Sequence, residues 1–308
     1  MEELLLVFYL RPARSEASDV AIAEVLALLQ MPHAWVSEQG PLSEQSGLFW
    51  IMLPAHRLDE AMTRLSRLGY TRAVDVLEPT FEPVQASRQR YETSRLVSEH
   101  RPAYHLRRIY EEDAGEIREL STDQHTFLPE CFAHTIPLVT GSCEHSPGRY
   151  CRGLPDYDAR LLVNLVTTPD GGRLLDPFAG VGSIVLAARA GGYSVYSTDN
   201  DPALCRGLSR LGSQHTVADA RSLPFADAMF DAIATEPPYH DSSTPAVVAS
   251  LAECARVLKP GCKLALLSAP SQVDALRRQA TNLGLLTLLA APVGRKELDV
   301  VVLLWQKK

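Results

Sequence analysis

Acidic and glycine residues stand where each of four apolar runs in the second half of the chain ends. Asp-Pro-Phe-Ala-Gly-Val-Gly runs from Asp176 to Gly182, Asp199 ends the next run, Asp219 follows a weaker one, and Glu-Pro-Pro-Tyr runs from Glu236 to Tyr239. In an open parallel sheet, ligands bind at the edge formed by the carboxyl ends of the strands. The spacing therefore predicts a ligand site built from carboxylates and a glycine turn.

The first of these stretches has the pattern of a strand, a glycine turn and a helix. We predict a brief buried strand at Arg173–Leu175 and a helix at Ile184–Ala190 from the apolar spacing. Gly180 and Gly182 lack a Cβ, so a ligand can lie against their backbone, and amides at the helix start favour a polar or anionic group. A nicotinamide or flavin fingerprint needs Gly or Ala where this chain has Val185. The turn is therefore interpreted as the floor of another cofactor site, with a purely structural turn as the alternative.

Strands and helices alternate through the rest of this half. Further helices are predicted at 156–166, 202–211, 245–258 and 271–283, and further strands at 194–198, 216–218, 231–235, 263–268, 285–291 and 299–305. The alternation predicts an α/β fold, a doubly wound, mostly parallel Rossmann-like sheet over residues 150–308. The last two strands fit a hairpin, and Val300–Trp305 is apolar without alternation, as expected of a strand buried on both faces.

The first 77 residues have a different order of elements. They are predicted as strand 4–10, helix 19–30, strands 34–37 and 48–53, helix 58–68 and strand 72–76. That order indicates a small ferredoxin-like α+β domain at 1–77. Residues 78–149, broken by prolines, are interpreted as a connector. Its Cys131, His134 and Cys143, with Cys151, match no familiar zinc spacing, so no metal is predicted.

The composition bounds the class of protein. A chain of 308 residues allows two modest domains, and 46% hydrophobic with 22% charged residues is typical of a globular protein rather than a disordered one. No apolar run approaches the length of a membrane span, and acidic residues before Leu4–Leu10 argue against a signal peptide. Six cysteines without regular spacing fit reduced thiols. We therefore expect a cytoplasmic protein.

The charge is unevenly distributed. A net charge of -7 argues against nucleic-acid binding, yet the segment from Gln85 to Tyr110 has six arginines against two glutamates, which makes it +4. Tyr91 and Tyr104 are interleaved with these arginines, and such a mixture can hold phosphates and stack on bases. The segment is interpreted as RNA-contacting. A solvated face, or pairing with the acidic run at 111–119, remains an alternative.

Taken as a set, these motifs resemble those of class I S-adenosylmethionine-dependent methyltransferases that methylate exocyclic amino groups. They are most similar to the THUMP-type tRNA guanosine-N2 methyltransferases, which share Asp-Pro-Phe-x-Gly-x-Gly, a Pro-Pro-Tyr motif and a segment like His145-Ser-Pro-Gly before a helix. The resemblance covers Ser146–Lys308, and the small first domain resembles that of THUMP-containing RNA methyltransferases. It implies a seven-stranded mixed sheet, S-adenosyl-L-methionine as cofactor and an RNA substrate, with tRNA favoured.

Several functions remain open beside tRNA guanosine-N2 methylation. Pro-Pro-Tyr motifs also serve adenine N6 methylation of DNA or RNA, and a protein glutamine amide is a further acceptor. A non-enzymatic alternative is an RNA-binding relative that has lost transfer through Glu236. The base, its position and the oligomeric state are left undecided by the sequence.

The resemblance also implies roles for individual residues at the cofactor end. The methionine end would be held by Asp176, Phe178, Gly180 and Gly182, the ribose hydroxyls by Asp199, and the adenine by Asp219 and Ala220. Asp201 is expected to cap the helix that begins at Pro202.

Glu236, Pro237, Pro238 and Tyr239 would receive the nucleobase. An exocyclic amine is a poor nucleophile because its lone pair is conjugated with the ring. The Glu236 carboxylate and the Pro237 carbonyl could take its two hydrogens, and Tyr239 offers a stacking face. The family has Asp or Asn at the position of Glu236, and catalytic geometry is sensitive to displacements of about 1 Å, such as the extra methylene introduces.

Overall fold

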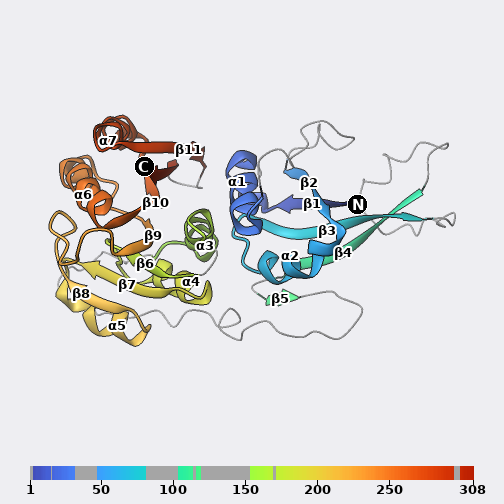
Figure 1. Ribbon diagram of the computed structural model, residues 1–308, viewed down its shortest axis with the longest axis horizontal. Helices are drawn as coiled ribbons and strands as arrows, with labels where there is room; N and C mark the ends of the chain where they lie inside the picture. The colour runs from blue at the N-terminus through green and yellow to red at the C-terminus, as the bar shows by residue number, and fades with distance from the viewer. Residues whose placement is uncertain are drawn as a thin grey trace.

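The computed structural model describes residues 3–14, 16–31, 47–80, 103–113, 116–118, 153–168, 171–294 and 299–308. Figure 1 shows two sheets, each with its own helices, placed side by side along the long axis. The larger sheet carries the candidate site, and the smaller one belongs to the first part of the chain. The predicted cysteine and histidine group at 131–151 lies outside the described residues, as does most of the arginine-rich segment.

The first sheet has five strands in the order β2-β1-β3-β4-β5. Its elements are β1 (Glu3–Leu10), η1 (Pro12–Arg14), α1 (Ser18–Leu29), β2 (Leu48–Pro54), η3 (Ala55–Arg57), α2 (Leu58–Leu65), β3 (Thr71–Thr80), β4 (Ala103–Asp113) and β5 (Glu116–Arg118). The central β1 is antiparallel to both β2 and β3, which is the ferredoxin-like arrangement. The strand predicted at 34–37 falls outside the described residues.

This sheet extends beyond the boundary predicted at residue 77. β3 continues to Thr80, and β4 pairs with it in antiparallel register from Ala73↔Glu111 to Thr80↔Ala103. Part of the predicted connector is therefore sheet. The end of the predicted RNA-contacting segment, residues 103–110, lies in β4.

The second sheet has seven strands in the order β11-β12-β10-β9-β6-β7-β8. Its elements are α3 (Asp156–Leu165), β6 (Arg173–Asp176), α4 (Ser183–Ala190), β7 (Ser194–Asp199), η6 (Pro202–Leu204), α5 (Cys205–Arg210), β8 (Gln214–Val217), β9 (Phe230–Thr235), η7 (Asp241–Ser243), α6 (Thr244–Val257), β10 (Leu258–Ser268), α7 (Pro270–Asn282), β11 (Leu285–Val293) and β12 (Val300–Lys307). β9 pairs in parallel with β10 and with β6, and β7 pairs in parallel with β6 and with β8. β12 is antiparallel to both of its neighbours, β10 and β11. The predicted doubly wound sheet with a final hairpin is therefore confirmed.

Helix α3 joins the two domains. Every residue from Asp158 to Leu165 is buried, because one side of the helix covers the large sheet and the other packs on α1. Figure 1 shows α3 and α1 side by side between the two sheets. Buried apolar residues of both domains form one cluster around this helix. The domains therefore share a core.

Polar side chains are buried within the same contact. Arg14 ends η1, and its Nη2 lies 3.2 Å from Asp158 Oδ2, while the Tyr70 hydroxyl donates to Asp158 Oδ1 at 2.7 Å. Glu24 of α1 is buried and accepts hydrogen bonds from the Gly69 amide at 2.6 Å and from Asn164 Nδ2 at 2.7 Å. The pKa of Glu24 is raised by its burial, and these hydrogen bonds offset only part of that rise. The network fixes the small domain on α3.

Within the described part of the chain, no helix is both long enough and apolar enough to cross a membrane.

Candidate active site

The glycine turn between β6 and α4 uses its two glycines for different reasons. Gly182 has φ 93°, in the left-handed region that favours glycine, and a Cβ there would lie 2.5 Å from Leu211 Cδ1, so that side chain would also have to shift. Gly180 has φ 50°, and a Cβ there would meet nothing within 4 Å. The backbone at Gly180 therefore borders open space, which is the feature expected of a turn that accepts a ligand.

Asp199 lies beside this turn at the end of β7. Its Oδ2 accepts a hydrogen bond from the Gly180 amide at 2.9 Å, and its Oδ1 accepts one from the Asp201 amide at 2.9 Å. Each carboxylate oxygen has a second lone pair for a ligand hydroxyl. Asp201 accepts from the Ala203 amide at 2.9 Å, so its predicted capping role is confirmed. The predicted helix at 202–211 is a 3-10 turn followed by the short α5.

Asp176 ends β6 and is only 1% exposed. Its Oδ1 accepts hydrogen bonds from Thr235 Oγ1 at 2.8 Å and from the Phe178 amide at 3.2 Å. The pKa of Asp176 is raised to about 7: burial is the main cause, the nearby carboxylates of Asp199 and Glu236 add to it, and the two hydrogen bonds oppose it. Carboxylates from three neighbouring strand ends are thus close enough to interact, and such a group favours a cationic ligand.

The ionisation of Asp176 gives a stability prediction. Its folded pKa is above the ordinary 3.8, so its contribution to stability is complete below pH 4 and is lost as the pH rises to about 7. Asp176→Asn cannot ionise and should gain, relative to wild type, up to about 4 kcal/mol in unfolding free energy between pH 4 and pH 8. Urea denaturation of the ligand-free protein measures this difference. Parallel pH profiles for the two proteins would show that Asp176 does not titrate in this range.

The Glu236–Tyr239 loop follows β9. The Tyr239 hydroxyl donates a hydrogen bond to Glu236 Oε1, and the Tyr239 ring packs partly buried against the core shared by the two domains. Gln272 Nε2 donates to the Pro238 carbonyl at 3.0 Å. The loop is therefore held by side chains as well as by its prolines. The sequence predicts only a stacking face at Tyr239, whereas in the structure its hydroxyl also binds the candidate catalytic carboxylate.

Asp219 lies beyond the end of β8 and is paired with Arg221. Arg221 Nη2 lies 2.6 Å from Asp219 Oδ2, and the Arg221 amide donates to Oδ1 at 2.8 Å. This partner lowers the pKa of the Asp219 carboxyl. An adenine amino group would have to share this carboxylate with the guanidinium. Ala220, which follows Asp219, is buried.

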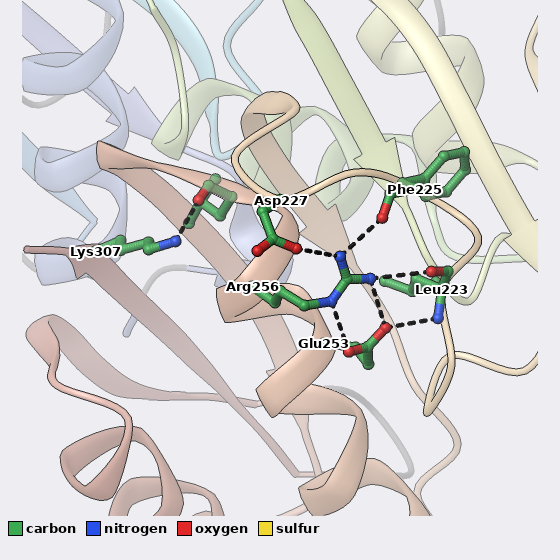
Figure 2. A network of polar contacts seen from close by, with 7 residues as sticks. Leu223, Phe225, Asp227, Glu253, Arg256 and Lys307 are labelled. Atoms are coloured by element: carbon green, nitrogen blue, oxygen red, sulfur yellow. Dashed lines mark hydrogen bonds and ion pairs between the residues drawn. The ribbon is translucent and has the colours of Figure 1, made fainter.

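The loop that carries Asp219 and Ala220 is bound to α6 by side-chain hydrogen bonds (Figure 2). Arg256 donates to the Leu223 carbonyl at 3.0 Å and to the Phe225 carbonyl at 2.8 Å. The Leu223 amide donates to Glu253 Oε2 at 2.8 Å, and Arg256 pairs with the same carboxylate at 2.8 Å. One arginine thus satisfies two backbone carbonyls of a loop that has no helix or strand of its own.

The predicted site residues come from the same edge of the sheet. Hydrogen bonds connect Asp176 with Phe178, Asp199 with Gly180, and Glu236 with Tyr239. Asp219 bonds to Arg221 instead, and among the residues that the structure describes it has no hydrogen bond to another predicted site residue. Thr235 and Gln272 were missed. Each has a weak sequence signal: Thr235 is polar at the end of an apolar run, and Gln272 stands three residues after the N-cap of α7, where a glutamine can bond back to the N-cap amide.

Comparison with known proteins agrees with this geometry. Residues 175–266 match the model of a methyltransferase domain. The seven strands, with β12 antiparallel, form the mixed sheet predicted for this domain. Residues 175–266 are thus similar in sequence to a methyltransferase domain, and the sheet that contains them has the fold of class I S-adenosylmethionine-dependent methyltransferases.

Two individual proteins are similar to the chain. A tRNA (guanine(10)-N2)-dimethyltransferase from Methanothermobacter thermautotrophicus is 38% identical over 96 residues, which cover 29% of this chain and 28% of that protein. The matched region thus spans less than a third of that relative. The crystal structure of TrmN from Thermus thermophilus aligns over 99% of this chain and 100% of its own, with a TM-score of 0.52 and 17% identity. The similarity to TrmN establishes a common fold for both domains.

Proposed function

We propose that the protein transfers the methyl group of S-adenosyl-L-methionine to an exocyclic amine of a nucleobase in RNA, with guanosine N2 in tRNA as the preferred acceptor. The observation that carries this proposal is the carboxylate of Glu236, which Tyr239 fixes at the carboxyl ends of the strands, near Asp176 and Asp199. The 38% identical region of a tRNA guanine-N2 dimethyltransferase supports the choice of acceptor.

The residues at this edge suit the cofactor. S-adenosyl-L-methionine supplies an activated methyl group on a sulfonium and also carries an ammonium. Asp176 and Asp199 would offset these positive charges, and the open backbone at Gly180 gives the ligand a surface to lie on. The second lone pairs of Asp199 suit the ribose hydroxyls. Because a cation favours the ionised form of a carboxyl, binding should lower the pKa of Asp176.

The acceptor loop would orient the amine. The Glu236 carboxylate and the Pro237 carbonyl would accept its two hydrogens and turn its lone pair towards the methyl group. Tyr239 fixes the direction of the carboxylate, and the two prolines limit rotation of the backbone between them. Most of the rate gain would come from this alignment, because positioning alone can remove several kcal/mol from a barrier.

Cofactor binding is tested at Asp199. Asp199→Ala should weaken cofactor affinity about 10-fold to 150-fold, because hydrogen bonds to a charged acceptor contribute about 1.5–3 kcal/mol. Asp199→Asn keeps one acceptor oxygen and should lose less. Isothermal titration calorimetry measures both, with Asp201→Ala as the matched control two residues away. Equal affinity for Asp199→Ala and the control would remove Asp199 from the cofactor site.

The acceptor is tested by product analysis. Bulk tRNA, rRNA and duplex DNA would be incubated with labelled cofactor and digested to nucleosides. N2-methylguanosine from tRNA is the expected product. The second candidate is adenine N6 methylation, favoured by the Pro-Pro-Tyr sequence itself, and N6-methyladenine as the labelled product would establish it instead.

A further inference from the structure

Gln272 connects the start of α7 to the acceptor loop. It is fully buried, and both ends of its amide have partners. Nε2 donates to the Pro238 carbonyl at 3.0 Å, and Oε1 accepts from the Ala269 amide at 3.3 Å. Pro238 and Gln272 are 34 residues apart in the chain, so this contact depends on the tertiary fold.

The position of Gln272 follows from the sheet. β10 lies beside β9 in parallel register, so the chain leaving β10 at Ser268 emerges next to the loop that leaves β9 at Thr235. α7 begins two residues after β10, and Gln272 lies in its first turn. The bond to the N-cap amide of Ala269 uses only the side-chain oxygen of this residue. The amide nitrogen, which the cap does not use, is the group that reaches the loop.

A second contact from the same turn holds the far end of the loop. Ser271 Oγ donates to Asp241 Oδ1 at 2.8 Å on the surface. The first turn of α7 therefore binds the chain at Pro238 and again at Asp241. Between these points lie Tyr239, which fixes Glu236, and His240.

We propose that Gln272 is a positioning residue for methyl transfer: it sets the orientation of the Pro237–Pro238 backbone and thereby the distance between the two groups that accept the amine hydrogens. This inference rests on the proposed function. With its carbonyl bound by Gln272, Pro238 is oriented by α7, and Pro237 presents the carbonyl available to the substrate. Gln272 touches neither substrate nor cofactor in this arrangement, so it acts through the loop.

The test uses Gln272→Glu, which keeps the size of the side chain and the acceptor for Ala269. Because this position is buried, the pKa of the introduced carboxyl should be raised: at pH 8 the carboxylate would face the Pro238 carbonyl without a proton to donate, and the protonated acid formed at lower pH would restore the donor. We expect kcat to fall about 10²-fold at pH 8, the effect typical of a displacement near 1 Å, with cofactor affinity within about twofold of wild type. Relative to wild type at each pH, activity should recover as the pH falls to 6.

Gln306→Glu is the matched control. Gln306 Nε2 also donates to a backbone carbonyl, that of Gly261, at 2.8 Å, but at the opposite end of the sheet. This control should retain wild-type kcat at both pH values. Equal kcat for the two variants, or a Gln272→Glu defect that does not change with pH, would overturn the proposal.

Amide hydrogen exchange of the loop provides a readout that does not depend on transfer. In Gln272→Glu at pH 8, the peptide containing Tyr239 and His240 should exchange faster than in wild type after correction for intrinsic rates, and the difference should shrink at pH 6. Unchanged exchange would refute the positioning role even if the variant were slow. If wild type binds cofactor but methylates no nucleic acid, the proposed function fails, and the exchange result still decides whether Gln272 holds the loop.

Discussion

Glu236→Ala should reduce methyl transfer about 10²–10³-fold, the usual loss when one preorganised polar group of a transition state is removed. Cofactor affinity should stay within about twofold, because the proposed role of this side chain is towards the acceptor. Single-turnover transfer and calorimetry on the same preparation separate the two effects. Asp274→Ala, which removes an exposed carboxylate from α7, is the control and should transfer at the wild-type rate.

Two further changes at this position separate charge from reach. Glu236→Gln keeps a carbonyl acceptor, so partial activity would indicate that orientation dominates, and complete loss would indicate proton acceptance. Glu236→Asp installs the residue of the resembling family but withdraws the carboxylate from Tyr239. An enzyme adapted to the longer side chain should slow down. A gain of activity would indicate that Glu236 had impaired an ancestral enzyme.

Asp158→Ala should destabilise the protein by about 3–5 kcal/mol, because it leaves the buried Arg14 guanidinium without its carboxylate. The Tyr70 hydroxyl loses its acceptor as well. Urea denaturation measures the loss. Glu60→Ala, which breaks a partly exposed pair with Arg64 in the small domain, is the control and should cost less than about 1 kcal/mol.

A double variant tests whether the stability lost in Asp158→Ala comes from the charge left on Arg14 or from changed packing. Replacing both partners, Arg14→Met with Asp158→Leu, removes the two buried charges together and should recover most of the stability lost by Asp158→Ala. If the double variant were as unstable as the single one, the cause would lie in the packing around α3 or in the Tyr70 hydroxyl, which lacks its acceptor in both variants, rather than in an uncompensated charge.

The methyltransferase half could be predicted from sequence because its signals are local. Apolar runs ending in Asp176, Asp199 and Glu236 mark strand ends, and the parallel-sheet rule then places those ends on one edge. Boundaries moved by a few residues: the strand predicted at 216–218 is β8 at Gln214–Val217. That strand is short and mostly exposed, so its pattern is weak.

Features that depend on packing between distant segments could not be predicted. Glu24 and Asp158 look like ordinary charges on amphipathic helices, and they are buried only because α1 packs on α3. β4 has no regular alternation of apolar and polar residues and follows Pro102, so its local sequence indicates a connector, and only its pairing with β3 shows it to be a strand. The role of Gln272 likewise requires the adjacency of β9 and β10.

We propose that the site carrying Glu236, at the carboxyl ends of the strands, methylates a guanosine amine in RNA. The most direct measurement is transfer of labelled methyl from S-adenosyl-L-methionine to bulk tRNA by the wild-type protein and by Glu236→Ala in parallel, with the label identified by nucleoside analysis. We expect labelled N2-methylguanosine from the wild type and about 10²–10³-fold less from the variant. Background label from the wild-type protein on every nucleic acid tested, with cofactor binding intact, would contradict the proposed function.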